Sequence, residues 1–235
     1  MKHKFIETKN FLKFRDGIES LKNIEDEDFK SARMGLFYGS YGIGKTWAIE
    51  KIAISERNGI LFLRAEEVWT KGYLVRKIGV ELGVLEGKTS EIYESIKNKL
   101  LYEEKIIVID EVDKLLNSKK HELLEVFRDI SDQTGCVIIF IGMEQSARKW
   151  QTHGHYFSRL RLFPMEKTDL DDIKNYCSLS DVELSNDLIE HFYTKLGNLR
   201  LIKRQIEAIE EECLKRDLES FDLEDYIELR KENKL

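Results

Sequence analysis

The chain has 235 residues, of which 42% are hydrophobic and 35% charged, with a single proline. This composition excludes wholesale disorder and favours a helix-rich globular protein with one large domain or a large domain and a small companion. The net charge of −6 is uneven, because residues 164–235 carry 11 basic and 19 acidic residues whereas residues 1–163 carry a net charge of +2. Any nucleic-acid surface is therefore expected on the first part of the chain.

Cysteine spacing argues against a disulfide-rich or zinc-binding protein, and hydropathy argues against a membrane protein. Cys136, Cys177 and Cys213 are widely spaced and form no CxxC pair. We therefore expect buried reduced thiols rather than a disulfide framework or a zinc site. The longest apolar run, Cys136–Ile141, is far shorter than the roughly 20 residues of a membrane span. Because residues 1–15 also lack the apolar core of a signal peptide, we expect a soluble cytoplasmic protein with no membrane partner.

Short apolar runs alternate with amphipathic segments along the first 163 residues. Runs rich in Ile, Val, Leu and Phe are typical of strands buried on both faces of a parallel sheet. They predict strands at Met34–Tyr38, Ile60–Arg64, Ile106–Asp110, Val137–Ile141 and Leu160–Phe163. Helical spacing predicts helices at Lys45–Glu56, Lys71–Leu82, Ser90–Tyr102 and Ser118–Ser131. The alternation predicts an α/β fold with three αβα layers around a parallel five-stranded sheet.

The pattern changes after Pro164. Thr168, Ser185 and Asp222 each precede an amphipathic stretch and are predicted N-caps. The stretches predict helices near 169–178, 185–195, 198–217 and 222–232. We therefore expect an α/β domain over residues 1–163 and a small helical lid over residues 164–235.

A complete phosphate-binding motif follows the first predicted strand and opens the first predicted helix. The segment Gly39-Ser40-Tyr41-Gly42-Ile43-Gly44-Lys45-Thr46 matches G-x-x-x-x-G-K-[ST]. Its glycines let successive backbone N–H groups wrap phosphate oxygens, helped by the helix N-terminus. Lys45 would reach the β- and γ-phosphates of ATP, the Thr46 hydroxyl would bind Mg²⁺, and Trp47 would adjoin the nucleotide. The competing interpretation, a glycine-rich turn followed by Lys-Thr, is disfavoured by the strand and helix on either side.

Two acidic residues end the third predicted strand. Asp110 and Glu111 follow the apolar run Ile106–Ile109. Because ligands bind at the carboxyl ends of parallel strands, both carboxylates are expected beside the phosphate loop. Asp110 would hold magnesium, and Glu111 would orient or deprotonate the attacking water. The sequence therefore predicts an ATPase.

The P-loop, the acidic pair and the predicted lid together resemble the AAA+ ATPases. Within that group the chain is similar to the ATPase subunits of transposition systems typified by the phage Mu B protein, from Thr8 to about residue 215. The segments that carry the likeness are Ile109–Leu115, Arg128–Gly135, Ile141–Glu144, Tyr156–Leu160 and Gly197–Arg200. The resemblance implies an ATP-dependent homo-oligomer, a ring or helical filament, that binds double-stranded DNA. It further implies a transposase partner that the ATPase activates and to which it delivers selected target DNA.

The resemblance also implies roles for individual residues. Arg159 matches the arginine finger that one AAA+ subunit inserts into its neighbour's nucleotide site, with Arg161 as the competing candidate. Arg200 matches the lid arginine that touches the γ-phosphate in the same chain, although helix capping by Asn198 alone could explain the local pattern. Family members usually place a polar sensor after the fourth strand. Here Met143 stands in that segment, so the sensor must be Glu144 or Gln145, or hydrolysis is slow.

DNA contact is expected from the ATPase domain itself. The Mu B protein carries an N-terminal helix-turn-helix domain, whereas only about thirty residues precede the ATPase module here. Two basic clusters are candidates, and solvated helix faces are the alternative interpretation of both. The clusters are Lys71, Arg76 and Lys77, and Lys114, Lys119 and Lys120.

Two other functions stay open. A helicase or clamp loader shares the Ser-Arg and lid-arginine features. An ATP-driven switch or chaperone acting on protein alone would share the nucleotide site, and the absence of DNA-stimulated hydrolysis would distinguish it from the other two.

Overall fold

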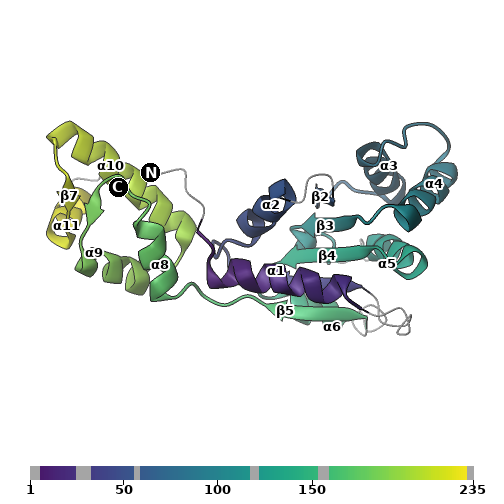
Figure 1. The fold of residues 1–235 in the computed structure, drawn as a ribbon, viewed down its shortest axis with the longest axis horizontal. Helices are drawn as coiled ribbons and strands as arrows, with labels where there is room; N and C mark the ends of the chain where they lie inside the picture. The colour runs from purple at the N-terminus through teal and green to yellow at the C-terminus, as the bar shows by residue number, and fades with distance from the viewer. Residues whose placement is uncertain (1–5, 25–32, 56–58, 117–121, 153–158, 232–235) are drawn as a thin grey trace. The chain divides into compact units, whose positions relative to one another are not determined.

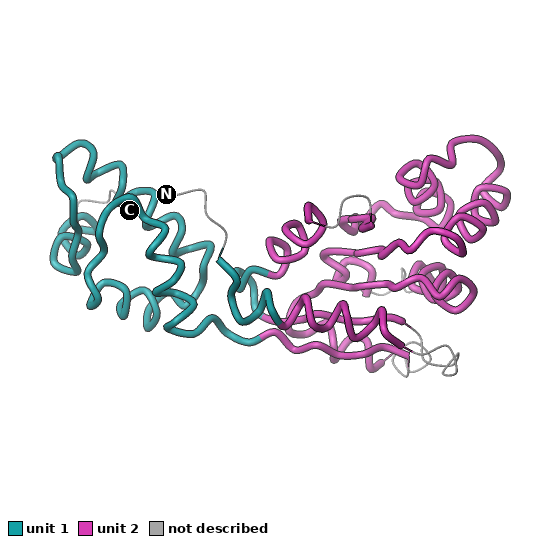
Figure 2. The backbone as a smooth tube through the Cα atoms, viewed as in Figure 1, with its two compact units in different colours: residues 1–12, 40–44, 166–235 teal, residues 13–39, 45–165 magenta. Residues whose placement is uncertain are grey.

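The structure is a computed structural model that describes residues 6–24, 33–55, 59–116, 122–152 and 159–231. Two compact units are distinguished (Figure 2). The sheet unit comprises residues 13–39 and 45–165, and the helical unit comprises residues 1–12, 40–44 and 166–235. The predicted division into domains at residue 164 stays a prediction. The compact units differ from it by placing residues 1–12 and 40–44 in the helical unit and residues 164 and 165 in the sheet unit.

The sheet unit contains a parallel five-stranded sheet in the order β2-β3-β4-β1-β5 (Figure 1). The α/β fold predicted from the sequence is thereby confirmed. Three strands have the predicted bounds, and the other two extend one residue further. The strands are β1 (Met34–Tyr38), β2 (Ile60–Arg64), β3 (Ile106–Asp110), β4 (Val137–Gly142) and β5 (Leu160–Pro164).

Helices cover both faces of this sheet. Most lie within a residue of their predicted positions, whereas α1 and α6 were not predicted. The predicted start of α5 at Ser118 lies outside the described residues, and α5 ends three residues after its predicted end at Ser131. The elements are α1 (Lys9–Lys22, whose first residues belong to the helical unit), α2 (Lys45–Ser55), α3 (Lys71–Glu81), α4 (Thr89–Tyr102), the 3₁₀ turn η2 (Val112–Lys114), α5 (Glu122–Thr134) and α6 (Ser146–Gln151).

Alternation along the strands divides the core of the sheet unit in two. In β3, Ile107 and Ile109 belong to the cluster formed with α3, α4, α5 and α6, whereas Ile106 and Val108 are buried outside it. This period of two is what pleated strands impose. On the opposite face, the Phe14 ring of α1 stacks on Phe37 of β1 at a centroid distance of 4.0 Å. The three layers fix the strand ends, and hence the loops that follow them.

The helical unit has its own core, built around the buried side chains of Ile202, Ile206 and Phe192. Two short strands, β6 and β7, pair in parallel beside the helices. The elements are α8 (Leu170–Cys177), β6 (Glu183–Leu184), α9 (Asn186–His191), the π-helical turn η3 (Phe192–Leu196), α10 (Leu199–Arg216), β7 (Ser220–Phe221) and α11 (Leu223–Lys231).

The predicted N-caps of this unit are correct in part. Asp222 accepts a hydrogen bond from the Asp225 amide and caps α11, as predicted. Ser185 occupies the N-cap position of α9, but its hydroxyl bonds the Asp187 carboxylate instead of the helix backbone. Thr168 was the wrong choice for α8, because the Asp169 carboxylate accepts from the Asp172 amide at 2.9 Å. A carboxylate at the N-cap also interacts favourably with the helix dipole.

The three cysteine side chains are buried and free, as predicted. Burial raises the pKa of the Cys136 and Cys177 thiols to about 12, because the thiolate would lose its hydration. Within the described part of the chain, no helix combines the length and apolar character needed to cross a bilayer.

Candidate nucleotide-binding site

The phosphate loop connects β1 to α2. Gly42 and Gly44 have φ values of +74° and +90°, which side chains with a Cβ rarely adopt. Lys45 is only 9% exposed, and its Nζ donates to the Gly39 carbonyl at 2.8 Å. The lysine of the motif therefore lies against its own loop, at the carboxyl edge of the sheet where ligands bind in such folds.

Thr46 and Asp110 meet as the sequence predicted. The Thr46 hydroxyl donates to Asp110 Oδ2 at 2.9 Å, although the two residues lie 64 positions apart. Asp110 ends β3 and is 4% exposed, so its carboxylate points into the protein rather than into solvent. The P-loop and the acidic strand end thus form a single cluster of polar groups.

This pair fits a magnesium ion. Mg²⁺ prefers oxygen ligands and is usually bound by one or two protein groups together with water and substrate phosphates. The Thr46 hydroxyl and the Asp110 carboxylate are such ligands and lie within 2.9 Å of each other. No cluster of three or more His, Cys, Asp and Glu side chains suited to a metal occurs among the described residues. A magnesium ion here would therefore complete its shell with phosphate and water oxygens.

Glu111 has an unusual backbone. Its φ of 56° and ψ of 39° place it in the left-handed region, where non-glycine residues are uncommon and tend to occur at functional sites. Its amide donates to Asp110 Oδ1 at 2.8 Å. This turn ends β3, and the Glu111 side chain in it is half-exposed.

Two cations hold the Glu111 carboxylate. Lys114, three residues further on, forms an ion pair with Oε2. Arg64 Nε lies 3.8 Å from Oε1, and its Nη2 lies 3.8 Å from Asp110 Oδ2. Sequence analysis missed Arg64. The available signal was a basic residue at the end of the second predicted strand, which pairs in register with Asp110.

The segment after β4 does not distinguish Glu144 from Gln145 as the polar sensor residue. Glu144 and Gln145 are both exposed, and Gln145 stands at the N-cap position of α6 without a side-chain cap bond. A partly buried polar link is instead made by Asp113, which accepts hydrogen bonds from the Met143 amide at 2.7 Å and the Ser146 hydroxyl at 2.8 Å. Asp113 thereby attaches the turn that follows Glu111 to the end of β4. The nucleotide role of Gln145 stays a prediction.

The two candidate finger arginines have partners in their own chain. Arg159 forms an ion pair with Asp132 of α5, and its side chain is 41% exposed. Arg161 Nη1 donates to the Ser20 carbonyl at 3.3 Å. No described contact joins either guanidinium to Asp110 or Glu111. A catalytic role for either arginine in its own chain would therefore require it to move.

Arg200, the predicted lid arginine, belongs to the helical unit. It lies in the first turn of α10, it is exposed, and its amide donates to Asn198 Oδ1 at 3.0 Å. Asn198 is therefore the N-cap of this helix. Its Nδ2 also donates to the Tyr41 carbonyl of the phosphate loop at 3.1 Å, a contact that sequence analysis did not predict.

The basic residues of α3 are largely engaged with carboxylates. Lys71 lies 3.4 Å from Glu122, and Lys77 Nζ lies 2.8 Å from Glu66, which raises the pKa of Lys77. Arg76 is exposed, with no described ion pair. Lys119 and Lys120 lie outside the described residues, and Lys114, as stated above, is paired with Glu111.

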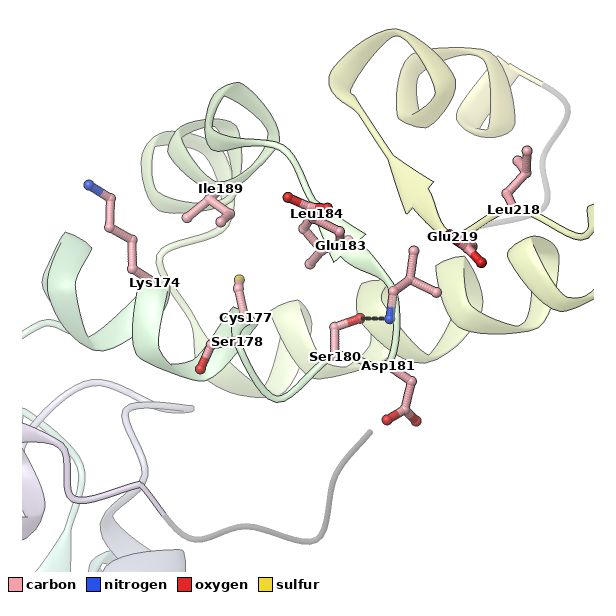
Figure 3. A pocket seen from close by; sticks show the side chains of 11 residues that line it. Lys174, Cys177, Ser178, Ser180, Asp181, Glu183, Leu184, Ile189, Leu218 and Glu219 are labelled. Atoms are coloured by element: carbon pink, nitrogen blue, oxygen red, sulfur yellow. Dashed lines mark hydrogen bonds between the residues drawn. The ribbon is translucent and has the colours of Figure 1, made fainter.

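A cavity of about 720 Å³ within the helical unit is a separate feature (Figure 3). Its charged lining consists of Lys174 against three carboxylates, so it is poorly suited to a polyphosphate. The carboxylates belong to Asp181, Glu183 and Glu219.

The parallel sheet and the P-loop joined to an acidic strand end define a P-loop NTPase fold. The AAA domain family matches residues 27–151, more than half of the chain, and the chain belongs to this family. Membership implies nucleotide binding. The Mu-like prophage FluMu DNA transposition protein B of Haemophilus influenzae is 23% identical over 161 residues, which cover 66% of this chain and 54% of that protein. This similarity supports the predicted likeness to transposition ATPases, although the chain spans only about half the length of this curated relative.

Solved structures share the fold. The ORC1 protein of Aeropyrum pernix in complex with DNA superimposes with a TM-score of 0.67 at 17% identity, over 97% of this chain and 66% of that one. The RuvB Holliday junction branch migration motor of Thermotoga maritima gives a TM-score of 0.59 at 16% identity, over 92% and 68%. A DNA replication initiation factor gives 0.56 at 18% identity, over 92% and 65%. At these identities the likeness concerns the fold.

Proposed function

We propose that this protein is an ATP-hydrolysing, DNA-binding AAA+ ATPase that regulates DNA transposition in the cytoplasm. The observation that carries the enzymatic part is the contact of Thr46 with Asp110, next to the left-handed Glu111. The observation that favours transposition is the similarity to the Mu-like prophage transposition protein B.

ATP would bind with its phosphates on the loop from Gly39 to Thr46. Lys45 would exchange its bond with the Gly39 carbonyl for the phosphate oxygens, since a charged acceptor binds an ammonium group more strongly than a neutral carbonyl. Magnesium held by Thr46 and Asp110 would neutralise phosphate charge. The same residues would bind ADP, which lacks only the γ-phosphate.

Glu111 would act as general base. Its backbone amide bonds Asp110, which in turn bonds Thr46 of the loop, and its carboxylate would accept a proton from the attacking water or orient it. In the present arrangement its carboxylate forms ion pairs with Arg64 and Lys114. A productive site therefore requires Glu111 to turn at least partly from these cations toward the water.

The charge that develops on the transferred phosphoryl group calls for a further cation. Arg159 of a neighbouring subunit would supply it after leaving Asp132, and Arg200 would contact the γ-phosphate from the same chain. This assignment makes the active enzyme a homo-oligomer.

Double-stranded DNA would bind the oligomer through α3, and a transposase would be the protein partner. A replication or branch-migration ATPase is the second candidate, because the described fold is shared with ORC1 and RuvB. The two candidates differ in partner and not in the nucleotide site.

Electron microscopy of the protein on duplex DNA with ATP or ADP tests the proposal. We expect rings or filaments on DNA with ATP and their loss with ADP. DNA that stays bare with both nucleotides, at concentrations where ATP is bound, would contradict the DNA-binding part. Stimulation of strand transfer by a purified transposase would then distinguish transposition from replication.

A further inference from the structure

The phosphate loop is bonded to the start of α10 through its carbonyl groups. Asn198 Nδ2 donates to the Tyr41 carbonyl at 3.1 Å, and the Leu199 amide donates to the Gly42 carbonyl at 3.1 Å. The next carbonyl, that of Ile43, lies 3.5 Å from Asn10 Nδ2, a longer contact. Three successive carbonyls of the loop therefore point to groups outside the loop, and all of these groups belong to the helical unit.

The orientation of these carbonyls fixes the orientation of the amides. In a planar trans peptide the C=O and the following N–H point in opposite directions. Because the carbonyls of residues 41 and 42 point toward α10, the N–H groups of Gly42 and Ile43 point away from it. Gly42 and Gly44 have positive φ, whereas Ile43 does not. Alternation of this kind makes successive N–H groups converge on an anion.

Asn198 itself has little freedom. It is 6% exposed, and its Oδ1 accepts from the amides of Arg200 at 3.0 Å and Leu201 at 3.3 Å. Since two donors face one end of the side-chain amide and a carbonyl faces the other, only this orientation of the amide satisfies all three partners. A Cβ on Gly42 would lie 2.0 Å from Asn198 Oδ1, so only glycine at this position lets the loop lie this close to the Asn198 side chain.

We propose that Asn198 is a positioning residue that holds the phosphate loop with its amides directed at the α- and β-phosphates. The inference rests on the proposed binding of ATP at this loop. Arg200 is expected to favour ATP over ADP through the γ-phosphate. Asn198 acts on the part of the loop that both nucleotides use, so its loss weakens both to the same extent.

The test measures the affinity of the full chain for MgATP and MgADP by calorimetry. Asn198→Ser and Asn198→Asp both keep an oxygen that can cap α10, and both remove the Nδ2 donor. Asp222→Ala is the matched control, because it removes an N-cap of the helical unit far along the chain from the loop. We expect both Asn198 variants to bind ATP and ADP about tenfold more weakly, the typical effect of one lost hydrogen bond. The control should change neither affinity.

Several results would overturn the inference. The first is an unchanged nucleotide affinity of Asn198→Ser, including the case in which only Asn198→Asp loses affinity, which would point to its added charge. The others are a loss of affinity for ATP alone and an equal loss of affinity in Asp222→Ala. Lys45→Ala separates this outcome from failure of the proposed function. If Lys45→Ala binds nucleotide as the wild type does, the loop is not the site. If it fails to bind while Asn198→Ser binds normally, only the role of Asn198 is wrong.

Discussion

Glu111 combines a strained backbone, a carboxylate paired with two cations and a place directly after Asp110. A left-handed glutamate costs free energy that a glycine would not, about 1 kcal/mol or more. It follows the buried Asp110 directly, and its carboxylate is held by Lys114 and Arg64. Strained backbone positions tend to occur at functional sites, and Glu111 lies directly beside the Thr46–Asp110 pair.

Replacing Glu111 by Gln should leave ATP binding intact and slow hydrolysis by about 10²–10⁴. The amide keeps the size of the side chain but cannot accept the proton of water. Single-turnover hydrolysis of radiolabelled ATP measures the change, and the exposed Glu86→Gln is the matched control. Hydrolysis at the wild-type rate by Glu111→Gln would show that another residue is the base.

Gly42 and Gly72 differ in backbone conformation and in the space available for an added Cβ. Gly42 has φ of +74° and would clash with Asn198, so Gly42→Ala should weaken ATP binding at least about tenfold. Gly72 lies in α3 with its nearest neighbour, Thr89 Oγ1, 3.9 Å from an added Cβ. Gly72→Ala should therefore raise stability by about 0.5–1 kcal/mol, through helix propensity, and leave ATP binding unchanged. Nucleotide titration and thermal unfolding measure both effects. A Gly42→Ala protein with normal affinity would contradict the loop geometry.

The individual site residues that could be predicted from the sequence are those that lie in short motifs. The P-loop, Asp110 and Glu111 were identified because spacing within a motif is local. Arg64 was missed because its contact depends on strand register, and Asp113 because its partners lie 30 or more residues away. Their roles are not readable without the order of the strands.

Among the elements, α3 is the one through which we propose that DNA binds. Lys71 and Lys77 are paired with carboxylates of the sheet unit, whereas Arg76 is exposed without a described ion pair. Phosphates would have to compete for the two lysines, and the displaced carboxylates would then repel DNA. Arg76 should therefore contribute most to binding among the three.

Replacing Lys71, Arg76 and Lys77 by Ala should weaken binding to any duplex and flatten its salt dependence. Arg76→Ala alone should account for the largest share. Fluorescence anisotropy with unrelated duplexes at several salt concentrations measures both quantities. The charge-matched control replaces Lys174, Lys195 and Lys203 of the helical unit. Equal affinities and salt slopes in the two triple variants would leave α3 as a solvated face.

The bounds of the elements show where sequence patterns suffice. β1, β2 and β3 were predicted to the residue because each apolar run is bounded at both ends by a charged residue or a glycine. The helix α1 was missed although Phe14, Ile18 and Leu21 recur at helical spacing and the Thr8 hydroxyl accepts a hydrogen bond from the Phe11 amide at its N-terminus. The π-helical turn η3 could not be predicted, because no side-chain pattern distinguishes it from the helix before it.

At the scale of the whole molecule, the proposed active site requires more than one chain. Arg159 is paired with Asp132 within its own chain and has no described contact with the acidic pair. Arg159→Ala should bind ATP almost normally but hydrolyse it about 10³–10⁵-fold more slowly. Mixing it with Lys45→Ala should restore part of the rate, because intact loops then meet intact arginines. The rate of the mixture against each variant alone measures this.

Arg161→Ala is the control for that experiment. Failure of the Arg159→Ala mixture to recover, with mixed oligomers verified by cross-linking, would mean that Arg159 acts within its own chain or not at all. Loss and recovery by Arg161→Ala instead would move the role two residues along.

The most direct test of the proposed function is the steady-state rate of ATP hydrolysis with and without duplex DNA, with Lys45→Ala as the blank. We expect magnesium-dependent hydrolysis by the wild type that DNA increases, and none by Lys45→Ala. Wild-type hydrolysis no faster than the blank, with or without DNA, would contradict the assignment of this protein as a DNA-dependent ATPase.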